Sequence, residues 1–349
     1  MKHMRHMQQM KQWTMNATGR ANLRLTGAPV PEPGPGEILV KVSAVSLNYR
    51  DRLAIDEGLT MVFPENGPFV PGSDMAGEVA AVGVGVDRFA PGDRVISTCL
   101  PGWIEGPGPG NARLGGPEAL GSGHHPGVLA EYVVLDQNWA VRAPQSLSAV
   151  EASTLPMAGL SAWTALVEQG RVHAGETVVV QGTGGVALFG LQIAAAHGAE
   201  VVVISGDDTK LARTKELGAA HRINRLTQDW VAAVHELTHD HGADHILETI
   251  GGHHLARSIE AAAVGGHISL IGILEGYEVS GHVGHLARKK LRIDGLQAGH
   301  RRALEDLVRA ADRITLRPVI AAEYALPDLP SALAHLERGA FGKVVVTAA

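Results

Sequence analysis

The sequence predicts an α/β protein in which a doubly wound parallel sheet is joined to a second, β-rich domain. Between residues 36 and 141, short β-branched runs are separated by Gly and Pro turns, which is typical of a β-barrel or sandwich. From Thr177 onward, runs of Val and Ile alternate with segments of helical length, which predicts strand–helix–strand units. A glycine-rich turn after the first of these strands is a third, independent indication.

Four strands are expected in the β-rich part. Ile38–Val42 follows a Pro-Gly-Pro-Gly turn, and Glu78–Val82 precedes two closely spaced glycines. The turn Pro91–Asp93 leads into a third strand, and Ala130–Val134 forms the fourth. Residues 101–127 are dense in Gly and Pro and have no apolar period, so we expect a long surface loop there.

The parallel half contains five strand candidates with continuous rather than alternating apolar character. Such runs fit strands that are buried on both faces. Gly198 and Gly218 each follow an apolar helical segment and are expected at left-handed positions that end helices. The strand candidates are Thr177–Gln181, Glu200–Ser205, His221–Asn224, His245–Thr249 and His267–Ile271.

The turn after the first of these strands reads G-x-G-x-x-A and leads into an apolar helix. Gly182 permits the tight turn, Gly184 lets the backbone approach a pyrophosphate, and Ala187 keeps the helix close to the sheet. The helix N-terminus faces the negative charge. Because the strand before and the helix after are both present, a dinucleotide site is favoured over a turn that binds nothing. The predicted cofactor-binding residues here are Gly182, Thr183, Gly184, Gly185 and Val186.

The end of the second strand bears on which dinucleotide binds. Sites that prefer NAD place a carboxylate there, whereas this strand ends at Ser205-Gly206. Asp207 and Asp208 come slightly later and are expected to cap the next helix. Lys210 and Arg225 supply positive charge for a 2′-phosphate. The prediction is NADPH, with NAD as the alternative because Asp207 could reach back.

Composition limits the function classes. The 349 residues are enough for two domains, and 45% hydrophobic with 19% charged residues indicates a globular chain. The net charge of −6, without a Lys/Arg block, argues against a nucleic-acid partner. The apolar runs are strand-sized, far below the roughly 18 residues of a membrane span. Residues 1–10 lack the apolar core of a signal peptide, and the first nine could be an extension before Met10. A cytoplasmic location is expected.

Metal and nucleophile sites are disfavoured. Cys99 is the only cysteine, which excludes an intrachain disulfide and a cysteine-based metal site, and it is expected to fill apolar space. The 18 histidines are scattered. His239, His241 and His245 lie in a polar segment without the spacing of a metal-binding helix, so surface positions are favoured. His267 carries no special signal.

Seven motifs carry a family resemblance: Val30–Glu37, Ser46–Asp51, Pro71–Gly77, Pro91–Val95, Thr154–Gly159, Gly182–Ala187 and Phe341–Val346. In this order they resemble the medium-chain dehydrogenase/reductase superfamily, near its zinc-type alcohol dehydrogenase-like and quinone oxidoreductase-like branches. The resemblance implies a GroES-like β-barrel catalytic domain from residues 1–143 and a return segment, 299–349. It also implies a Rossmann domain at 144–298 and hydride transfer with NAD(P)H in the cleft between the domains.

The chain departs from zinc-dependent members of that superfamily at each ligand position. Asn48 stands where they have a cysteine, Ser73-Asp74 where they have a His-Glu pair, and Met157 where they have a second cysteine. The loop 101–127 replaces their lobe of four cysteines. Since neither Asn nor Met is a competent zinc ligand, we expect no zinc.

In the quinone oxidoreductase-like branch, the resemblance places Asn48 and Asp51 beside the nicotinamide and Met157 beneath it, and brings Lys343 to the cleft as a cofactor-binding residue. Asn48, Tyr49 and Arg50 are candidate donors to a developing oxyanion, so Asn48, Tyr49 and Asp51 are the predicted catalytic residues. Alternatively, Tyr49 and Arg50 only pack and pair at the domain edge.

The predicted function is therefore NADPH-dependent, zinc-independent reduction of a small-molecule quinone or α,β-unsaturated carbonyl. Two alternatives stay open: metal-free alcohol or aldehyde oxidoreduction, and an NADPH-binding sensor or interaction protein with little turnover. The resemblance also implies a homodimer, in which Lys290–Gln297 could supply an interface strand.

Overall fold

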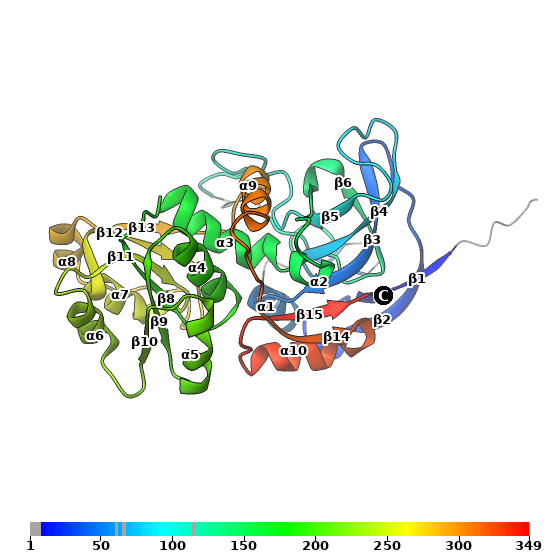
Figure 1. The fold of residues 1–349 in the computed structure, drawn as a ribbon. Coiled ribbons are helices and arrows are strands. Elements are labelled where there is room, and N and C mark those ends of the chain that lie inside the picture. Colours follow the sequence, from blue (N-terminus) through cyan, green and yellow to red (C-terminus); the bar gives the residue numbers. More distant parts are fainter. Residues whose placement is uncertain (1–7, 60–61, 65–67, 114–115, 117, 349) are drawn as a thin grey trace, which may run out of the picture. The chain divides into compact units, whose positions relative to one another are not determined.

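A computed structural model describes residues 8–59, 62–64, 68–113, 116 and 118–348 of the chain. The chain divides into two compact units, whose elements are labelled in Figure 1. The first unit contains the residues up to Met157, His300–Thr315 and the chain from Ile320 onward, and the second contains Ala158–Gly299 and Leu316–Val319. The boundary between the two units, expected after residue 143, lies after Met157 instead, because helix α2 (Ala149–Ala152) packs on strands of the first unit.

The first unit is built on a mostly antiparallel seven-stranded sheet, ordered β14-β15-β3-β4-β5-β7, with β6 also paired to β3. The four expected strands are all present, with shifted ends. The strands are β3 (Glu37–Ser46), β4 (Asp74–Val82), β5 (Arg94–Ser97), β6 (Tyr132–Asp136), β7 (Ala140–Arg142), β14 (Ile320–Ala325) and β15 (Lys343–Thr347). A separate two-stranded sheet, β1 (Gln9–Thr14) with β2 (Arg24–Pro29), lies at the start of the described chain.

Strand β15 inserts into this sheet from the far end of the chain. It pairs antiparallel with β3, with Val345 opposite Ser46, and the Leu47 amide donates to the Val344 carbonyl at 2.9 Å. Helix α10 (Leu329–Glu337) lies beside β14 and β15 (Figure 1). This register places the first residue of β15 next to the residues that follow β3. The other helical segments of the unit are α1 (Tyr49–Glu57), α9 (Arg301–Ala311), η1 (Arg20–Asn22), η2 (Gln137–Trp139) and η7 (Leu326–Asp328).

The second unit contains a six-stranded, all-parallel sheet ordered β10-β9-β8-β11-β12-β13. The order reverses between β8 and β11, which is the topological switch point of a doubly wound sheet. Its strands are β8 (Thr177–Gln181), β9 (Glu200–Ser205), β10 (His221–Asn224), β11 (Ala243–Glu248), β12 (Ala262–Leu270) and β13 (Arg292–Gly295). The predicted α/β fold class is confirmed, and the bounds of β8, β9 and β10 match the expected strands.

Helices alternate with these strands, as the sequence pattern predicts. Gly198 follows α4 with φ +81° and Gly218 follows η5 with φ +104°, both in the left-handed region. The α-helices of the unit are α3 (Leu160–Trp163), α4 (Gly185–Ala196), α5 (Asp208–Thr214), α6 (Trp230–Leu237), α7 (Leu255–Ala261) and α8 (Val283–Lys289). The 3₁₀ segments are η5 (Lys215–Leu217) and η6 (Gly252–His254), η4 (Thr164–Gln169) is π-helical, and the π-helical η3 (Leu155–Gly159) spans the passage between the units.

The expectation that His245 lies at the surface is wrong. His245 is in β11 and His267 is in β12, and both are buried. Each Nε2 lies 3.1 Å from a carboxylate, that of Glu176 and that of Asp294 respectively. Burial, with Arg292 nearby, lowers the pKa of His267 to about 4, so its contact with Asp294 near neutral pH is made by a neutral imidazole.

The segment 101–127 is only partly a surface loop. Its described residues contain turns and a bridge between Ser122 and His125, but Ala119 and Leu120 are buried. The Leu120 amide donates to the Cys99 carbonyl at 3.0 Å, and the Leu120 side chain joins the core of the first unit. Cys99 itself is buried, as expected. Within the part of the chain described here, no helix has the length and apolarity to cross a membrane.

Candidate functional site

The glycine-rich turn of the second unit leaves a helix N-terminus unobstructed. Gly182 has φ +81°, which favours glycine, and its amide donates to the Ile204 carbonyl at 2.6 Å. Gly184 caps α4 in an extended conformation and is exposed. A Cβ atom added at either glycine would meet nothing within 4 Å. The backbone amides of the turn, including those of Thr183, Gly185 and Val186, are therefore placed where an anionic group could approach closely.

At the end of β9, both nearby carboxylates are engaged in local structure. Asp207 caps α5, where its Oδ1 accepts from the Lys210 amide at 3.0 Å. Asp208 Oδ1 accepts from Asn224 Nδ2 at 2.7 Å. The predicted capping role is confirmed for Asp207.

A cation lies beside the same strand end. The Arg225 amide donates to the Ser205 carbonyl at 3.0 Å, which ties Arg225 to the end of β9. Its Nη2 lies 3.6 Å from the point where a Cβ of Gly206 would be. The Arg225 guanidinium thus lies beside Gly206, which has no side chain to fill the space. A second cation, Lys210, is in the first turn of α5.

The switch point of the sheet contains a buried carboxylate that the sequence analysis missed. Glu248, at the end of β11, is fully buried and accepts from the amides of Ile250 and Gly251, both at 3.0 Å. Its other oxygen accepts from Ser258 Oγ at 2.5 Å and from His254 Nδ1 at 3.0 Å. Burial raises the pKa of Glu248, but the hydrogen bonds from His254 and Ser258 outweigh it, so the net pKa is lowered.

Gln181 connects this carboxylate to the glycine turn. Its Nε2 donates to Glu248 at 3.1 Å, and its backbone carbonyl accepts from Thr249 Oγ1 at 2.8 Å. The ends of β8 and β11 are therefore held together directly before Gly182. A charged residue that ends an otherwise apolar strand was the available sequence signal.

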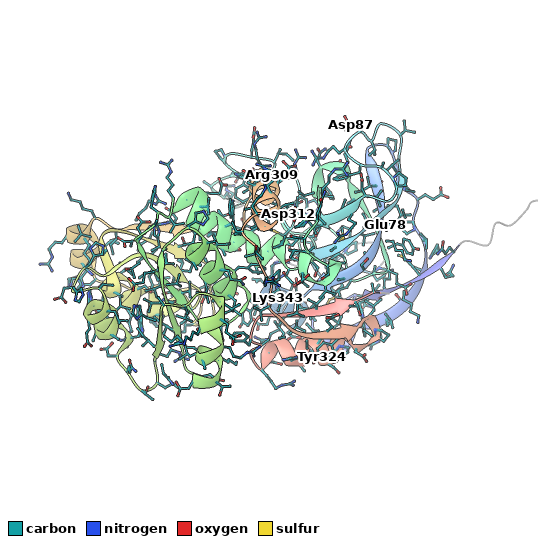
Figure 2. The ribbon with its side chains drawn as sticks, in the orientation of Figure 1. Glu78, Asp87, Arg309, Asp312, Tyr324 and Lys343 are labelled. Atoms are coloured by element: carbon teal, nitrogen blue, oxygen red, sulfur yellow. The ribbon has the colours of Figure 1, made fainter. Side chains whose placement is uncertain are left out.

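A buried polar cluster occupies the first unit where β3 gives way to α1. Asn48 is the N-cap of α1, and its amide donates to Asp51 Oδ2 at 2.8 Å. Lys343, labelled in Figure 2, is the first residue of β15 and is buried. Its Nζ donates to the Leu47 carbonyl at 2.7 Å and to Asn48 Oδ1 at 2.6 Å. The insertion of β15 beside β3 thus brings an ammonium group to the start of α1.

Asp74, at the start of β4, belongs to the same cluster. Its Oδ1 accepts from Ser73 Oγ at 2.6 Å, and its Oδ2 accepts from the Met157 amide at 2.9 Å. Burial raises the pKa of Asp74 to about 6, although Lys343 lowers it. Burial likewise raises the pKa of Asp51, and it lowers the pKa of Lys343 against the pull of Asp74 and Asp51.

The three candidate donors differ in what they already bind. Arg50 Nη1 donates to Asp51 and to the Leu120 carbonyl, both at 3.2 Å. Tyr49 accepts from Arg52 Nη1 at 3.1 Å. Asn48 is 7% exposed, and its Nδ2 is a buried donor without a hydrogen-bond partner among the described residues. Of the three, Asn48 is the one whose side-chain donor is both buried and without a hydrogen-bond partner among the described residues.

The positions that correspond to zinc ligands hold a different chemistry. Asn48 and Asp74 meet in the cluster, whereas Met157 joins it through its backbone amide. The Lys343 ammonium lies 2.6 Å from Asn48 Oδ1, where it would repel a divalent cation. Among the described residues there is no group of three or more His, Cys, Asp or Glu side chains able to hold a metal ion. These residues do not fit a zinc site.

Comparison with known proteins places these sites in context. Family models match at residues 34–145, the alcohol dehydrogenase GroES-like domain, and at residues 185–313, the zinc-binding dehydrogenase. A zinc-type alcohol dehydrogenase-like protein of Schizosaccharomyces pombe is 37% identical over 320 residues, covering 89% of this chain and 91% of its own.

Solved structures of alcohol dehydrogenase-like and quinone oxidoreductase proteins are similar to this chain over nearly its whole length. A Sinorhizobium meliloti 1021 protein assigned as an alcohol dehydrogenase is 57% identical with a TM-score of 0.94, covering 97% of this chain and 98% of its own. The quinone oxidoreductase of Coxiella burnetii is 26% identical with a TM-score of 0.77, covering 97% of this chain and 99% of its own.

Proposed function

The chain belongs to the medium-chain dehydrogenase/reductase superfamily of NAD(P)-dependent oxidoreductases, and we propose that it prefers NADPH, acts without zinc and reduces a quinone or an α,β-unsaturated carbonyl compound. The observation that carries the proposal is the unpartnered Asn48 Nδ2 beside the buried Lys343 ammonium. A nicotinamide cofactor supplies the hydride when bound. The residues of this chain must hold that cofactor and stabilise charge on the acceptor.

Hydride addition to a conjugated carbonyl places negative charge on the carbonyl oxygen. Asn48 Nδ2 can donate a hydrogen bond to that oxygen, since this buried atom has no hydrogen-bond partner among the described residues. In this proposal Asp51 holds the Asn48 backbone at the helix cap, and water supplies the proton that completes the reduction. Tyr49 stays a second candidate, since its hydroxyl accepts from Arg52 and can still donate its own O–H.

The proposal of zinc independence rests on the donor set. An amide, a thioether and a single carboxylate stand at the ligand positions, and an ammonium lies within hydrogen-bond distance of the amide. Purified protein, dialysed and analysed for metals, should contain far less than one zinc per chain and keep full activity after chelation. Stoichiometric zinc whose removal abolishes turnover would overturn this part of the proposal.

The NADPH preference is supported at the end of β9. Asp207 and Asp208 are held in local bonds, while the Arg225 guanidinium stands beside Gly206. Because a charge-assisted bond to a phosphate contributes about 1.5–3 kcal/mol, Arg225→Ala should weaken NADPH binding by about tenfold or more. NADH binding should stay within about twofold. Equal weakening of both cofactors would argue against a 2′-phosphate contact.

Alcohol oxidation without metal is the second candidate, and one observation favours it. Asp74 is buried, has its pKa raised to about 6 and is bonded to Ser73 Oγ, so it could take up a proton near neutral pH. One assay separates the candidates: NADPH oxidation with quinones, enones and aldehydes, beside NADP⁺ reduction with alcohols. Turnover of quinones or enones supports the main proposal, turnover of alcohols alone supports the second, and tight NADPH binding without turnover indicates a sensor or interaction protein.

We also propose a homodimer formed through the edge strand β13. Large apolar side chains are exposed in the segment before it, including Leu274, Tyr277, Val279 and Val283. An unpaired edge beside exposed apolar surface is suited to pairing with a second copy. Tyr277→Asp should shift the mass measured by light scattering toward the monomer, whereas Leu226→Asp, equally exposed at 68%, should not. The cytoplasmic location stays a prediction.

A further inference from the structure

We propose that Lys343 is a positioning residue that sets the orientation of the Asn48 side-chain amide, so that Nδ2 is the atom offered to the acceptor oxygen. This inference rests on the proposed function and adds to it a residue from the opposite end of the chain. The sequence suggested a different role for Lys343, contact with the cofactor. The two roles differ in what a substitution should change.

The contact geometry determines which end of the amide faces Lys343. Its Nζ lies 2.6 Å from Asn48 Oδ1 and 2.7 Å from the Leu47 carbonyl. An ammonium group only donates hydrogen bonds, so it requires an acceptor from Asn48. With the amide reversed, Nδ2 would face the ammonium donor to donor. The Leu47 carbonyl, held in place by the pairing of β3 with β15, anchors the second N–H of Lys343.

The other end of the amide is left unused in consequence. Asn48 Nδ2 is buried and has no hydrogen-bond partner within the described chain, which is uncommon for a buried donor. The carboxylates of Asp51 and Asp74 lie close to this group, since the Asn48 side chain helps to lower the pKa of both, but neither carboxylate makes a hydrogen bond of good geometry with Nδ2. Nδ2 therefore keeps donor capacity that an acceptor oxygen could use.

The charges around the cluster favour the protonated form of Lys343, which is the form that donates to Asn48 Oδ1. Asp51 and Asp74 raise its pKa against the effect of burial, and Arg50 balances Asp51 through a contact of 3.2 Å. The hydrogen bond from a cation to Oδ1 also draws electron density from the amide, which strengthens the Nδ2–H group as a donor. Lys343 thereby acts on the acceptor oxygen through Asn48.

A double-mutant cycle tests this coupling. Asn48→Asp keeps an acceptor for Lys343 but removes the donor, and Lys343→Met keeps the side-chain length but removes the hydrogen bond. Each should lower kcat by about 100-fold, the usual effect of losing one oxyanion donor, with NADPH affinity within about twofold. Because both act through one donor, the double variant should be no slower than either single variant. Lys343→Arg, which can still donate, should recover part of kcat.

A matched control addresses loss of stability. Lys289 also uses its ammonium to bind backbone carbonyls, those of Ile259 and Ala262 among them, but in the second unit. Lys289→Met should lower the unfolding temperature and leave kcat unchanged. If Lys343→Met is too unstable to assay, Asn48→Asp and Lys343→Arg still form a cycle.

Two results would overturn the inference: multiplicative effects of the two substitutions, or a loss of NADPH affinity in Lys343→Met that accounts for its lower turnover. The cycle can be run on whichever acceptor the wild type reduces, so failure of the quinone and enone assignment is a separate outcome. If there is no turnover, NMR of ¹⁵N-asparagine-labelled protein decides. The Asn48 side-chain resonances, identified by their absence in Asn48→Asp, should move in Lys343→Met, and unchanged resonances refute the coupling.

Discussion

Replacing Asp74 by Asn should change the pH dependence of stability in a predictable direction. The folded protein raises the pKa of Asp74 from 3.8 to about 6, because its carboxylate is buried. The unfolded chain releases this proton at lower pH than the folded chain does. The wild type is therefore penalised as pH rises through the window from about 4 to 6, and the penalty is absent below it. Asn carries no charge at any pH, and its carbonyl can still accept from the Met157 amide.

The magnitude follows from the two pKa values. Each pH unit between them costs the folded state about 1.4 kcal/mol, so the full penalty is about 3 kcal/mol, of which about 1.3 kcal/mol develops between pH 5 and 7. Urea unfolding should show that the stability of Asp74→Asn, relative to wild type, increases by about 1.3 kcal/mol between pH 5 and 7. Asp93→Asn is the control. Because Arg142 lowers the pKa of Asp93, the stability difference between Asp93→Asn and wild type should not change with pH above pH 5. A difference for Asp74→Asn that does not change between pH 5 and 7 would refute the reasoning.

Three further predictions concern the second unit. Gly184→Val should weaken NADPH binding by at least about tenfold, while the unfolding temperature stays near that of wild type because a side chain there meets only open space. Gly27→Val, also in open space, is the control and should leave NADPH binding intact. Unchanged NADPH affinity in Gly184→Val would show that the turn is not part of the cofactor site. Gly206→Asp should shift the ratio of NADPH to NADH affinity toward NADH by about tenfold, because it places a carboxylate beside Arg225; fluorescence titration with both cofactors checks this. Glu248→Gln should lower the free energy of unfolding by about 1–3 kcal/mol, because the hydrogen bonds at this position lose a charged acceptor, and a variant as stable as wild type in urea would contradict that.

Local pattern was sufficient where the structure is locally determined. The runs at Val178–Val180 and Val201–Ile204 identify β8 and β9 because such strands are buried on both faces. The positive φ of Gly182 and the capping by Asp207 also depend on a few neighbouring residues. By contrast, β12 begins at Ala262, five residues before the expected start, because Ala and Gly carry no strand signal of their own.

The candidate sites were harder to predict because their contacts are not local. Lys343 meets Leu47 and Asn48 only because β15 pairs with β3, and no short window of sequence contains that pairing. His245 looked like part of a polar surface, yet β11 is an inner strand of the sheet, which buries His245 beside Glu176. Glu248 required knowledge that β8 and β11 are neighbours. The residue types indicated the chemistry of the sites, but the pairing of strands distant in the sequence determined which side-chain atoms are free to bind a ligand.

The insertion of β15 has a consequence for how the chain acquires its function. The hydrogen bond between Lys343 and the Leu47 carbonyl closes a loop of 296 residues, among the most distant contacts a chain of this size can make. Contacts between residues so far apart in the chain slow folding, because the loop must close before the contact contributes. During synthesis, the glycine turn of the second unit can therefore form before the polar cluster of the first unit is complete. If the cluster acts as proposed, turnover requires that β15 has joined the sheet.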